Sequence, residues 1–336
     1  MLLSVPRIEC FNPLFPPKWM GSDTSTSNTT LISGKVLSED TVSFKSVKYA
    51  DLPFDIFKAS YEQVMEYALQ VSIRFSKRTS LPISEALTGK VTEIEIPIKS
   101  SNQRVHAWDI RNKDNKKWII YYYGAGDNRT SGQGLYKEIL DNGYNILVHD
   151  YGGFGKDTGN MAPKTLRLYN QALMDYLKKN GVKAEDTGVI AQCIGAFPAT
   201  ELAKTNPNLK FLILTSPVNS IKNFAVHNIA AKDTKPSFIV KNFKLDDAEQ
   251  AMHQFPYALD KIDNVIKTET NVAEITVPTH IIYSKQDRLL PPGDVERIAK
   301  HTKNLASSTA LENAPHGPSA PMIEVISKIL GINIGS

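Results

Sequence analysis

The fold of this chain is decided by one short stretch, residues 188–197, which reads GVIAQCIGAF. An apolar run, expected to be a buried strand, leads directly into Cys193, and residues 196–204 follow as a helix candidate. A strand that turns this sharply into a helix needs small residues two positions before and two positions after the tip of the turn. Ala191 and Gly195 occupy these positions, so the stretch has the form of a nucleophile elbow with Cys193 at its tip.

Cys193 would then lie at the N-terminus of a helix, where backbone N–H groups and the helix dipole favour a thiolate. The alternative is a buried structural cysteine, which is the commonest state of a free cysteine. The ten residues of the elbow do not separate the two interpretations by themselves.

Two later segments favour the catalytic interpretation. Residues 277–287, VPTHIIYSKQD, predict a strand followed by a loop that carries Asp287, and residues 311–317, LENAPHG, place His316 before a glycine. The order is therefore nucleophile, acid and base, at intervals of 94 (287 − 193) and 29 (316 − 287) residues. One class of catalytic triads has this chain order and two others do not.

The surrounding sequence predicts an α/β fold. Short apolar runs alternate with helical patterns, which is typical of a parallel sheet covered on both faces. The runs are 118–123, 145–149, 188–191, 210–214 and 279–283, and the first helix candidates are 132–142 and 164–180. Residues 91–98 alternate apolar with polar and predict a strand with one wet face, with 104–110 as its hairpin partner. We therefore expect a mostly parallel, eight-stranded sheet with helices on both faces.

Two regions fall outside this alternation. The interval from Leu214 to Thr279 is 65 residues (279 − 214), so residues 219–270 are predicted to be an insertion that forms a lid over the carboxyl ends of the strands. Residues 1–90 are predicted to be an extension, with a proline-containing arm, a polar linker and an amphipathic helix at 55–77, before a catalytic domain at 91–336. The extension has three open roles, which are support for the lid, cover for a sheet edge and binding of a protein partner.

Two further motifs carry a resemblance to a known family. Residues 122–128, YYGAGDN, resemble the His-Gly-Asn-Ala-Gly-Asn loop of the Bem46-like and serine-aminopeptidase-like branch of the α/β-hydrolases, with Tyr123 in place of His and Ala125 in place of Asn. Residues 150–159, DYGGFGKDTG, resemble its Asp-Tyr-Arg-Gly-x-Gly-x-Ser motif, with Gly152 in place of Arg. The resemblance covers roughly residues 91–330. It implies an oxyanion hole formed by the backbone N–H groups of Ala125 and Ile194, which neither substitution removes.

The departure with most chemical consequence is Cys193, because most members of the family carry serine there. Dienelactone hydrolases and polyhydroxyalkanoate synthases are similar in having a cysteine elbow. The resemblance then implies a Cys193–His316–Asp287 triad that forms an enzyme thioester. It would act on an ester or thioester substrate with an apolar acyl part, as an esterase or thioesterase. Three alternatives stay open, namely an acyltransferase with a non-water acceptor, a peptidase or amidase, and a catalytically inactive binding protein on the same scaffold.

Composition excludes several other classes. The 336 residues carry a net charge of only +4, and Cys10 and Cys193 are the only cysteines, so neither nucleic-acid binding nor a cysteine-rich metal site is expected. Residues 124–129 and 153–159 depart from nucleotide-binding glycine motifs, and no His-Glu-x-x-His occurs, so no cofactor and no metal are expected. Cys10 is expected to be a bystander, and His149, inside an apolar run, a hydrogen-bonded core histidine.

The sequence contains no run of apolar residues long enough to predict a transmembrane helix. Residues 1–20 are interrupted by prolines and lack a basic region before an apolar core, so they do not predict a signal peptide. The default expectation is a soluble, cytoplasmic protein with a small-molecule or acyl-chain substrate, and export without such a peptide stays open.

Overall fold

The predicted sheet is present in the computed structural model, which describes residues 80–99, 101–157, 163–230, 267–291 and 293–334. Eight strands lie in the order β1-β2-β4-β3-β5-β6-β7-β8. Their bounds are β1 Val91–Pro97, β2 Arg104–Ile110, β3 Lys117–Tyr122, β4 Tyr144–His149, β5 Thr187–Gln192, β6 Leu212–Thr215, β7 Thr279–Ser284 and β8 Leu305–Leu311. The β1–β2 and β2–β4 pairs are antiparallel and all other pairs are parallel, which confirms a mostly parallel, eight-stranded sheet.

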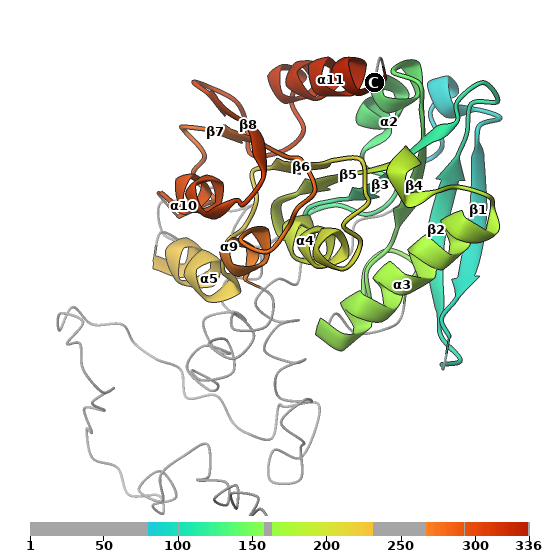
Figure 1. Ribbon diagram of the computed structural model, residues 1–336, viewed down its shortest axis with the longest axis horizontal. Helices are drawn as coiled ribbons and strands as arrows, with labels where there is room; N and C mark the ends of the chain where they lie inside the picture. The colour runs from blue at the N-terminus through green and yellow to red at the C-terminus, as the bar shows by residue number, and fades with distance from the viewer. Residues whose placement is uncertain (1–79, 100, 158–162, 231–266, 292, 335–336) are drawn as a thin grey trace, which may run out of the picture. The chain divides into compact units, whose positions relative to one another are not determined.

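Helices cover both faces of this sheet. The α-helices are α2 Gln133–Asp141, α3 Pro163–Lys179, α4 Ala196–Thr205, α5 Ile221–Ala230, α9 Thr268–Val272, α10 Asp294–His301 and α11 Ala320–Ile334, and short 3-10 turns lie at Glu85–Leu87, Ala184–Asp186 and Cys193–Gly195. Helices α2 and α11 pack side by side over one face, while α3, α4 and α9 pack against one another on the other (Figure 1). Within the described residues, no helix is long and apolar enough to cross a membrane.

The two kinds of strand differ as their sequence patterns predict. Every residue of the central strands β4 and β5 is buried, because helices cover both of their faces. The hairpin of β1 and β2 is confirmed, with Val91 opposite Ile110 and Pro97 opposite Arg104. Strand β1 lies at the edge of the sheet and leaves most of its residues partly or fully exposed, which accounts for its polar alternation.

The last strand was not located by the sequence patterns. Strand β8 reads LASSTAL and has no buried residue, and β7 is its single neighbour among the described strands. A half-exposed edge strand needs no continuous apolar run, so the periodicity that found the buried strands gives no signal here.

The predicted extension and lid are only partly within the described residues. The arm, the linker and the helix at 55–77 lie outside them, as do residues 231–266 of the insertion, so these remain predictions. The described end of the extension is attached to the loop before α2. The Leu81 N–H donates to Thr130 Oγ1 (2.8 Å), and the Gln133 side chain bonds both the Ser84 N–H (2.6 Å) and the Pro82 carbonyl (2.8 Å).

His149 at the end of β4 is a core residue, as predicted, with 1 % of its surface exposed. The rings of Tyr122, Tyr151 and Tyr169 surround it at centroid distances of 5.3, 5.3 and 6.2 Å. The expectation that it is fully hydrogen-bonded is wrong, because Nδ1 has no partner among the described residues. Aromatic edges replace polar partners here, and burial lowers the pKa of His149 to about 3.

We therefore predict that His149→Phe weakens the acid sensitivity of folding. An unfolded histidine titrates near pH 6.5. Between that value and the pKa of about 3 in the folded protein, the unfolded state binds the extra proton, so stability falls as the pH falls. From about pH 7 to about pH 5 the variant should lose about 2 kcal/mol less unfolding free energy than wild type. Urea unfolding at both pH values measures this, and equal losses in the two proteins would contradict it.

Candidate active site

Cys193 lies at the tip of a sharp turn between β5 and α4. Its φ is 54°, in the left-handed region that residues with a side chain seldom adopt, and it is buried. Among the described non-glycine residues, only Cys193 and Ser216 have a positive φ. A Cβ atom on Gly195 would lie 2.5 Å from the Tyr122 carbonyl oxygen, so the turn tolerates no side chain there. This is the small-residue requirement that the sequence pattern predicted.

Asp287 and His316 are in direct contact. Asp287 follows β7 and His316 follows β8, and the His316 Nδ1 to Asp287 Oδ2 distance is 2.6 Å. The other Asp287 oxygen accepts the N–H groups of Leu289 (2.9 Å) and Leu290 (3.3 Å), which fix the carboxylate in its loop. His316 Nε2 is buried and has no hydrogen-bond partner among the described residues.

The charge state of the His316 imidazole depends on both Asp287 and Cys193. Burial lowers its pKa, but the nearby Cys193 side chain and the hydrogen bond to Asp287 raise it by more, so the net pKa lies above the ordinary 6.5. Burial raises the pKa of Asp287, but His316 and the two backbone donors lower it by more. An imidazole with a raised pKa beside a cysteine favours the thiolate form of that cysteine.

Ser284 links the loop that carries Asp287 to the loop that carries His316, and no sequence pattern indicated this role. Its buried hydroxyl oxygen accepts the N–H of Gln286 (3.3 Å) and the N–H of Ala314 (3.1 Å). The residue ends β7, three positions before Asp287, and a serine at a strand end has no pattern that would single it out.

The predicted oxyanion loop lies against the elbow. A Cβ atom on Gly124 would be 3.3 Å from the Cys193 Cβ, so the loop approaches the nucleophile as closely as a glycine allows. Ala125 and Ile194, the predicted donors, are both buried, at 2 % and 0 % exposure. Their roles, like those of the triad, remain predictions.

Gln192 is a second residue that sequence reasoning missed. Its buried carboxamide lies near two backbone segments of the site, since added Cβ atoms on Gly124 and Gly317 would be 3.5 and 3.6 Å from its Nε2. Its Oε1 accepts the hydroxyl of Tyr121 at 3.1 Å, which orients the amide. The side chain thus lies near both the predicted oxyanion loop and the loop of His316.

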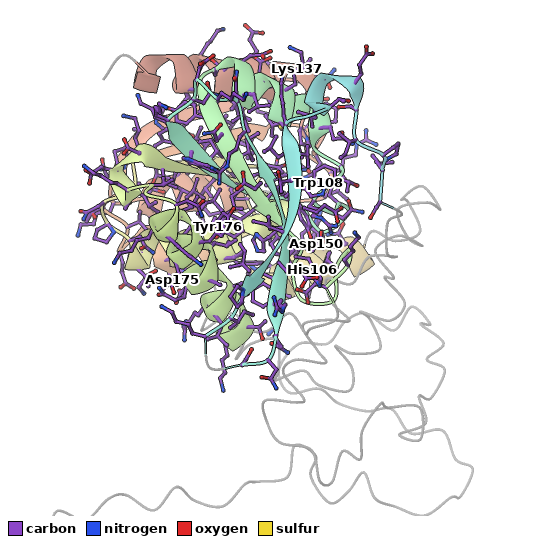
Figure 2. All side chains as sticks on the ribbon, turned by 90° about the vertical axis from the view of Figure 1, so that its right-hand side faces the viewer. His106, Trp108, Lys137, Asp150, Asp175 and Tyr176 are labelled. Carbon is purple, nitrogen blue, oxygen red and sulfur yellow. The ribbon has the colours of Figure 1, made fainter. Side chains whose placement is uncertain are left out.

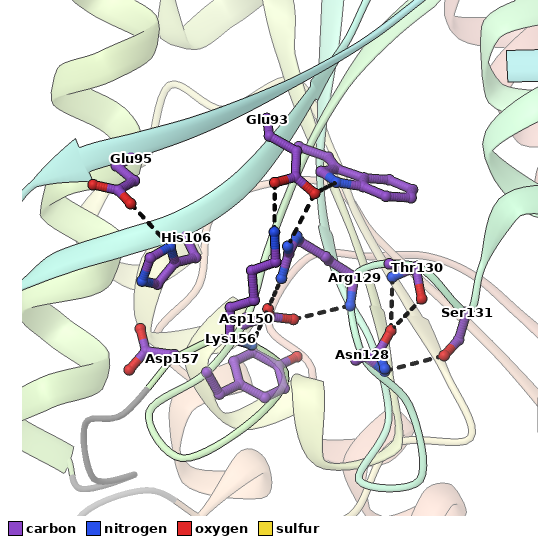
Figure 3. Close-up of polar contacts among 12 residues, drawn as sticks. Glu93, Glu95, His106, Asn128, Arg129, Thr130, Ser131, Asp150, Lys156 and Asp157 are labelled. Atoms are coloured by element: carbon purple, nitrogen blue, oxygen red, sulfur yellow. Dashed lines mark hydrogen bonds and ion pairs between the residues drawn. The ribbon is translucent and has the colours of Figure 1, made fainter. Parts of the chain in front are cut away.

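A buried ion pair joins the two motif loops behind this site. Asp150 and Arg129 are 0 % and 1 % exposed and pair through Oδ2 and Nη1. Seen from the β1–β2 edge of the sheet, Asp150 lies behind the hairpin near His106 and Trp108 (Figure 2), and its N–H donates to the His106 carbonyl at 2.9 Å. The pair continues outward through Glu93 to Lys156 at the surface (Figure 3).

Helix α5, the first part of the predicted lid, is hydrogen-bonded to the loop that carries Asp287. The Asn228 amide donates to the Leu289 carbonyl (3.0 Å), and His227 Nε2 lies 3.3 Å from the Arg288 carbonyl. Residues 231–266 of the insertion lie outside the described residues. Within those residues, no group of three or more His, Cys, Asp or Glu side chains is arranged to hold a metal ion.

Comparisons with known proteins identify the fold. The esterase Pf2001 of Pyrococcus furiosus matches with a TM-score of 0.60 at 18% identity, over 78% of this chain and 96% of that one. Carboxyl esterase 2 of Tuber melanosporum matches with 0.54 at 17%, over 77% and 90%, and a 2,6-dihydroxy-pseudo-oxynicotine hydrolase with 0.56 at 17%, over 72% and 67%. The chain therefore has the α/β-hydrolase fold.

Sequence comparison adds little to this assignment. No family model matches the chain. An uncharacterized protein of Rickettsia prowazekii (strain Madrid E) is 29% identical over 104 residues, which is 30% of this chain. The matched region spans 44% of that relative's length.

The elbow geometry predicts that Gly195→Ala is strongly destabilising. The added methyl group would overlap a backbone oxygen that belongs to β3 and cannot rotate away. We expect a loss of about 3 kcal/mol in unfolding free energy, measured by urea unfolding. Gly134→Ala in α2 is the control, because nothing lies within 4 Å of its added Cβ and a helical alanine is favoured. Wild-type stability in Gly195→Ala would contradict the packing described for the elbow.

The contacts of His316 predict a pH-dependent reactivity of the Cys193 sulfur. In His316→Asn, iodoacetamide should alkylate Cys193 about tenfold or more slowly than in wild type at about pH 6, with a smaller difference at about pH 9, because the lost imidazolium no longer favours the thiolate. His301→Asn on α10, an exposed histidine, should keep the wild-type profile. Alkylation of His316→Asn at the wild-type rate throughout would contradict the pairing.

Proposed function

We propose that this protein is an acyl hydrolase that uses Cys193 as a covalent nucleophile on an ester or thioester with an apolar acyl part. The observation that carries the proposal is the strained, buried Cys193 at a helix N-terminus, near an imidazole that is hydrogen-bonded to Asp287. The α/β-hydrolase fold, shared with esterases, supports the same reaction class.

In this mechanism the Cys193 thiolate adds to the substrate carbonyl carbon, and the carbonyl oxygen becomes an oxyanion held by the N–H groups of Ala125 and Ile194. The intermediate collapses, the bond to the leaving group breaks, and protonated His316 donates its Nε2 proton to that group. The product is a Cys193 thioester. Neutral His316 then takes a proton from water, whose oxygen attacks the thioester carbon, and the Cys193 thiolate leaves with the imidazolium restored.

Asp287 would keep the imidazole in the tautomer with a proton on Nδ1 and stabilise its cationic form. This role favours an enzyme over an inactive binding protein on the same scaffold. A binding site gains nothing from a buried carboxylate that is fixed by two backbone donors and aimed at an imidazole.

The test is hydrolysis of p-nitrophenyl acetate and butyrate by wild type and two variants of the nucleophile. Cys193→Ala should lower kcat/KM by about 10³-fold or more, because it removes the attacking atom while leaving the fold. Cys193→Ser should fall by at least about 10²-fold, because a hydroxyl is not ionised by the imidazole as a thiol is. Cys10→Ser is the matched control and should keep the wild-type kcat/KM.

Adding propan-1-ol to the same assay separates hydrolysis from acyl transfer. We expect the free acid as the main product, with water as the acceptor. A propyl ester as the main product would assign the protein as an acyltransferase with the same triad. Unchanged hydrolysis by Cys193→Ala would overturn the proposed nucleophile.

A further inference from the structure

We infer that Asp150 is a positioning residue for the oxyanion hole, holding residues 123–129 so that the Ala125 N–H faces the carbonyl oxygen attacked by Cys193. The inference rests on the proposed function and adds to it a residue that touches neither substrate nor nucleophile. It also gives a role to Tyr123 and to the glycine-rich loop after Asp150.

One carboxylate oxygen of Asp150 accepts hydrogen bonds from both ends of residues 123–129, the predicted oxyanion loop. Oδ1 accepts the phenol hydroxyl of Tyr123 at 3.2 Å, where the loop leaves β3. The same oxygen accepts the backbone N–H of Arg129 at 3.0 Å, where the loop leads toward α2 (Figure 3). Ala125 lies between these two anchors, so the carboxylate fixes the span of backbone that carries its N–H.

The other carboxylate oxygen of Asp150, Oδ2, binds the Arg129 side chain and the glycine-rich loop that follows Asp150. Oδ2 pairs with the Arg129 guanidinium and accepts the Lys156 N–H at 3.0 Å. A Cβ atom on Gly155 would lie 2.1 Å from this oxygen, and Gly155 has a φ of 51°, so the glycine-rich loop folds closely around the carboxylate. The loop that superficially resembles a phosphate-binding motif therefore wraps an acid of its own chain.

Two hydrogen bonds between Tyr151 and Tyr123 connect the residue after Asp150 to the start of the predicted oxyanion loop. The Tyr151 N–H donates to the Tyr123 hydroxyl oxygen (3.1 Å), and the Tyr151 hydroxyl donates to the Tyr123 carbonyl oxygen (2.7 Å). The Tyr123 carbonyl belongs to the peptide bond that leads into Gly124. A histidine at position 123 would be shorter than the phenol that makes these contacts.

The contacts around Asp150 and Arg129 extend to a paired carboxylate, Glu93, nearer the surface. Lys156, with Trp108 Nε1 and Arg129, lowers the pKa of Glu93 to about 2 against the opposing effect of burial. The Tyr136 hydroxyl donates to the Arg129 carbonyl (3.0 Å), so α2 supports the far end of the loop as well. Arg129 is thus held at its N–H, its carbonyl and its side chain.

A position error of about 1 Å at a catalytic donor can cost about 10²-fold in rate. A merely structural ion pair would affect folding and all reactions of Cys193 alike. The distinguishing measurement compares two reactions of the same sulfur. Acylation by p-nitrophenyl acetate develops an oxyanion, whereas alkylation by iodoacetamide displaces iodide and develops none.

The experiment measures the ratio of the acylation rate to the alkylation rate at one pH. We expect the ratio to fall by about tenfold or more in Asp150→Asn, where an amide N–H₂ would face the Arg129 and Lys156 donors. Tyr123→Phe and Gly155→Ala perturb the same contacts of Asp150 and should also lower the ratio of acylation to alkylation. These two variants decide the question if Asp150→Asn does not fold.

Tyr122→Phe is the matched control. Tyr122 is as buried as Tyr123. The substitution removes its 2.7 Å hydrogen bond to Asn170 on α3, a residue outside the Asp150 contacts described above. Its ratio should equal that of wild type. A wild-type ratio in Tyr123→Phe and Gly155→Ala would overturn the inference alone, whereas absence of acylation in wild type would overturn the proposed function.

Discussion

The structure depends on one constraint, the left-handed backbone of Cys193 at the end of β5. That conformation is unfavourable for a residue with a side chain, and it persists because its surroundings leave no alternative. Gly195 is packed against the Tyr122 carbonyl, the Cys193 carbonyl accepts the Val218 N–H at 3.1 Å, and α4 begins immediately afterwards. The turn therefore presents the sulfur at the carboxyl edge of the sheet, where the loops after the neighbouring parallel strands converge.

Each converging loop is held by a different kind of contact. The acid loop is fastened by backbone donors to Asp287 and by Ser284, and the histidine loop by Ser284 again. Residues 123–129, the predicted oxyanion loop, are held by a buried ion pair instead. Such a pair is weak evidence for stability, because desolvation of both charges offsets much of their attraction. The pair lies between two loops, and both carboxylate oxygens of Asp150 accept hydrogen bonds. This arrangement fits a role in fixing the positions of the loops better than a role in raising stability.

Much of the fold could be predicted from the sequence because buried parallel strands and amphipathic helices have strong periodic signals. Strand β8 could not be located, since a half-exposed edge strand reads like a polar loop. The candidate triad could be predicted from chain order together with the elbow pattern. Ser284, Gln192 and the Arg129–Asp150 pair could not, because their roles arise from contacts between segments far apart in the chain, which no local pattern records.

His149 is a residue whose burial could be predicted from the sequence but whose contacts could not. Its apolar neighbours in sequence predict burial correctly, but the absence of a partner for Nδ1 follows from the tyrosine rings that three separate elements place around it. Sequence patterns thus predict where a residue lies relative to the core more reliably than they predict its partners.

The central claim is that the reaction passes through an acyl group on Cys193. Its most direct test is intact-protein and peptide mass spectrometry of the enzyme quenched in acid during turnover of p-nitrophenyl acetate. The account predicts a mass increase of about 42 Da, located on the peptide that contains Cys193 and absent from Cys193→Ala. Turnover with no acylated species at any quench time, or with the acyl group on another residue, would contradict it.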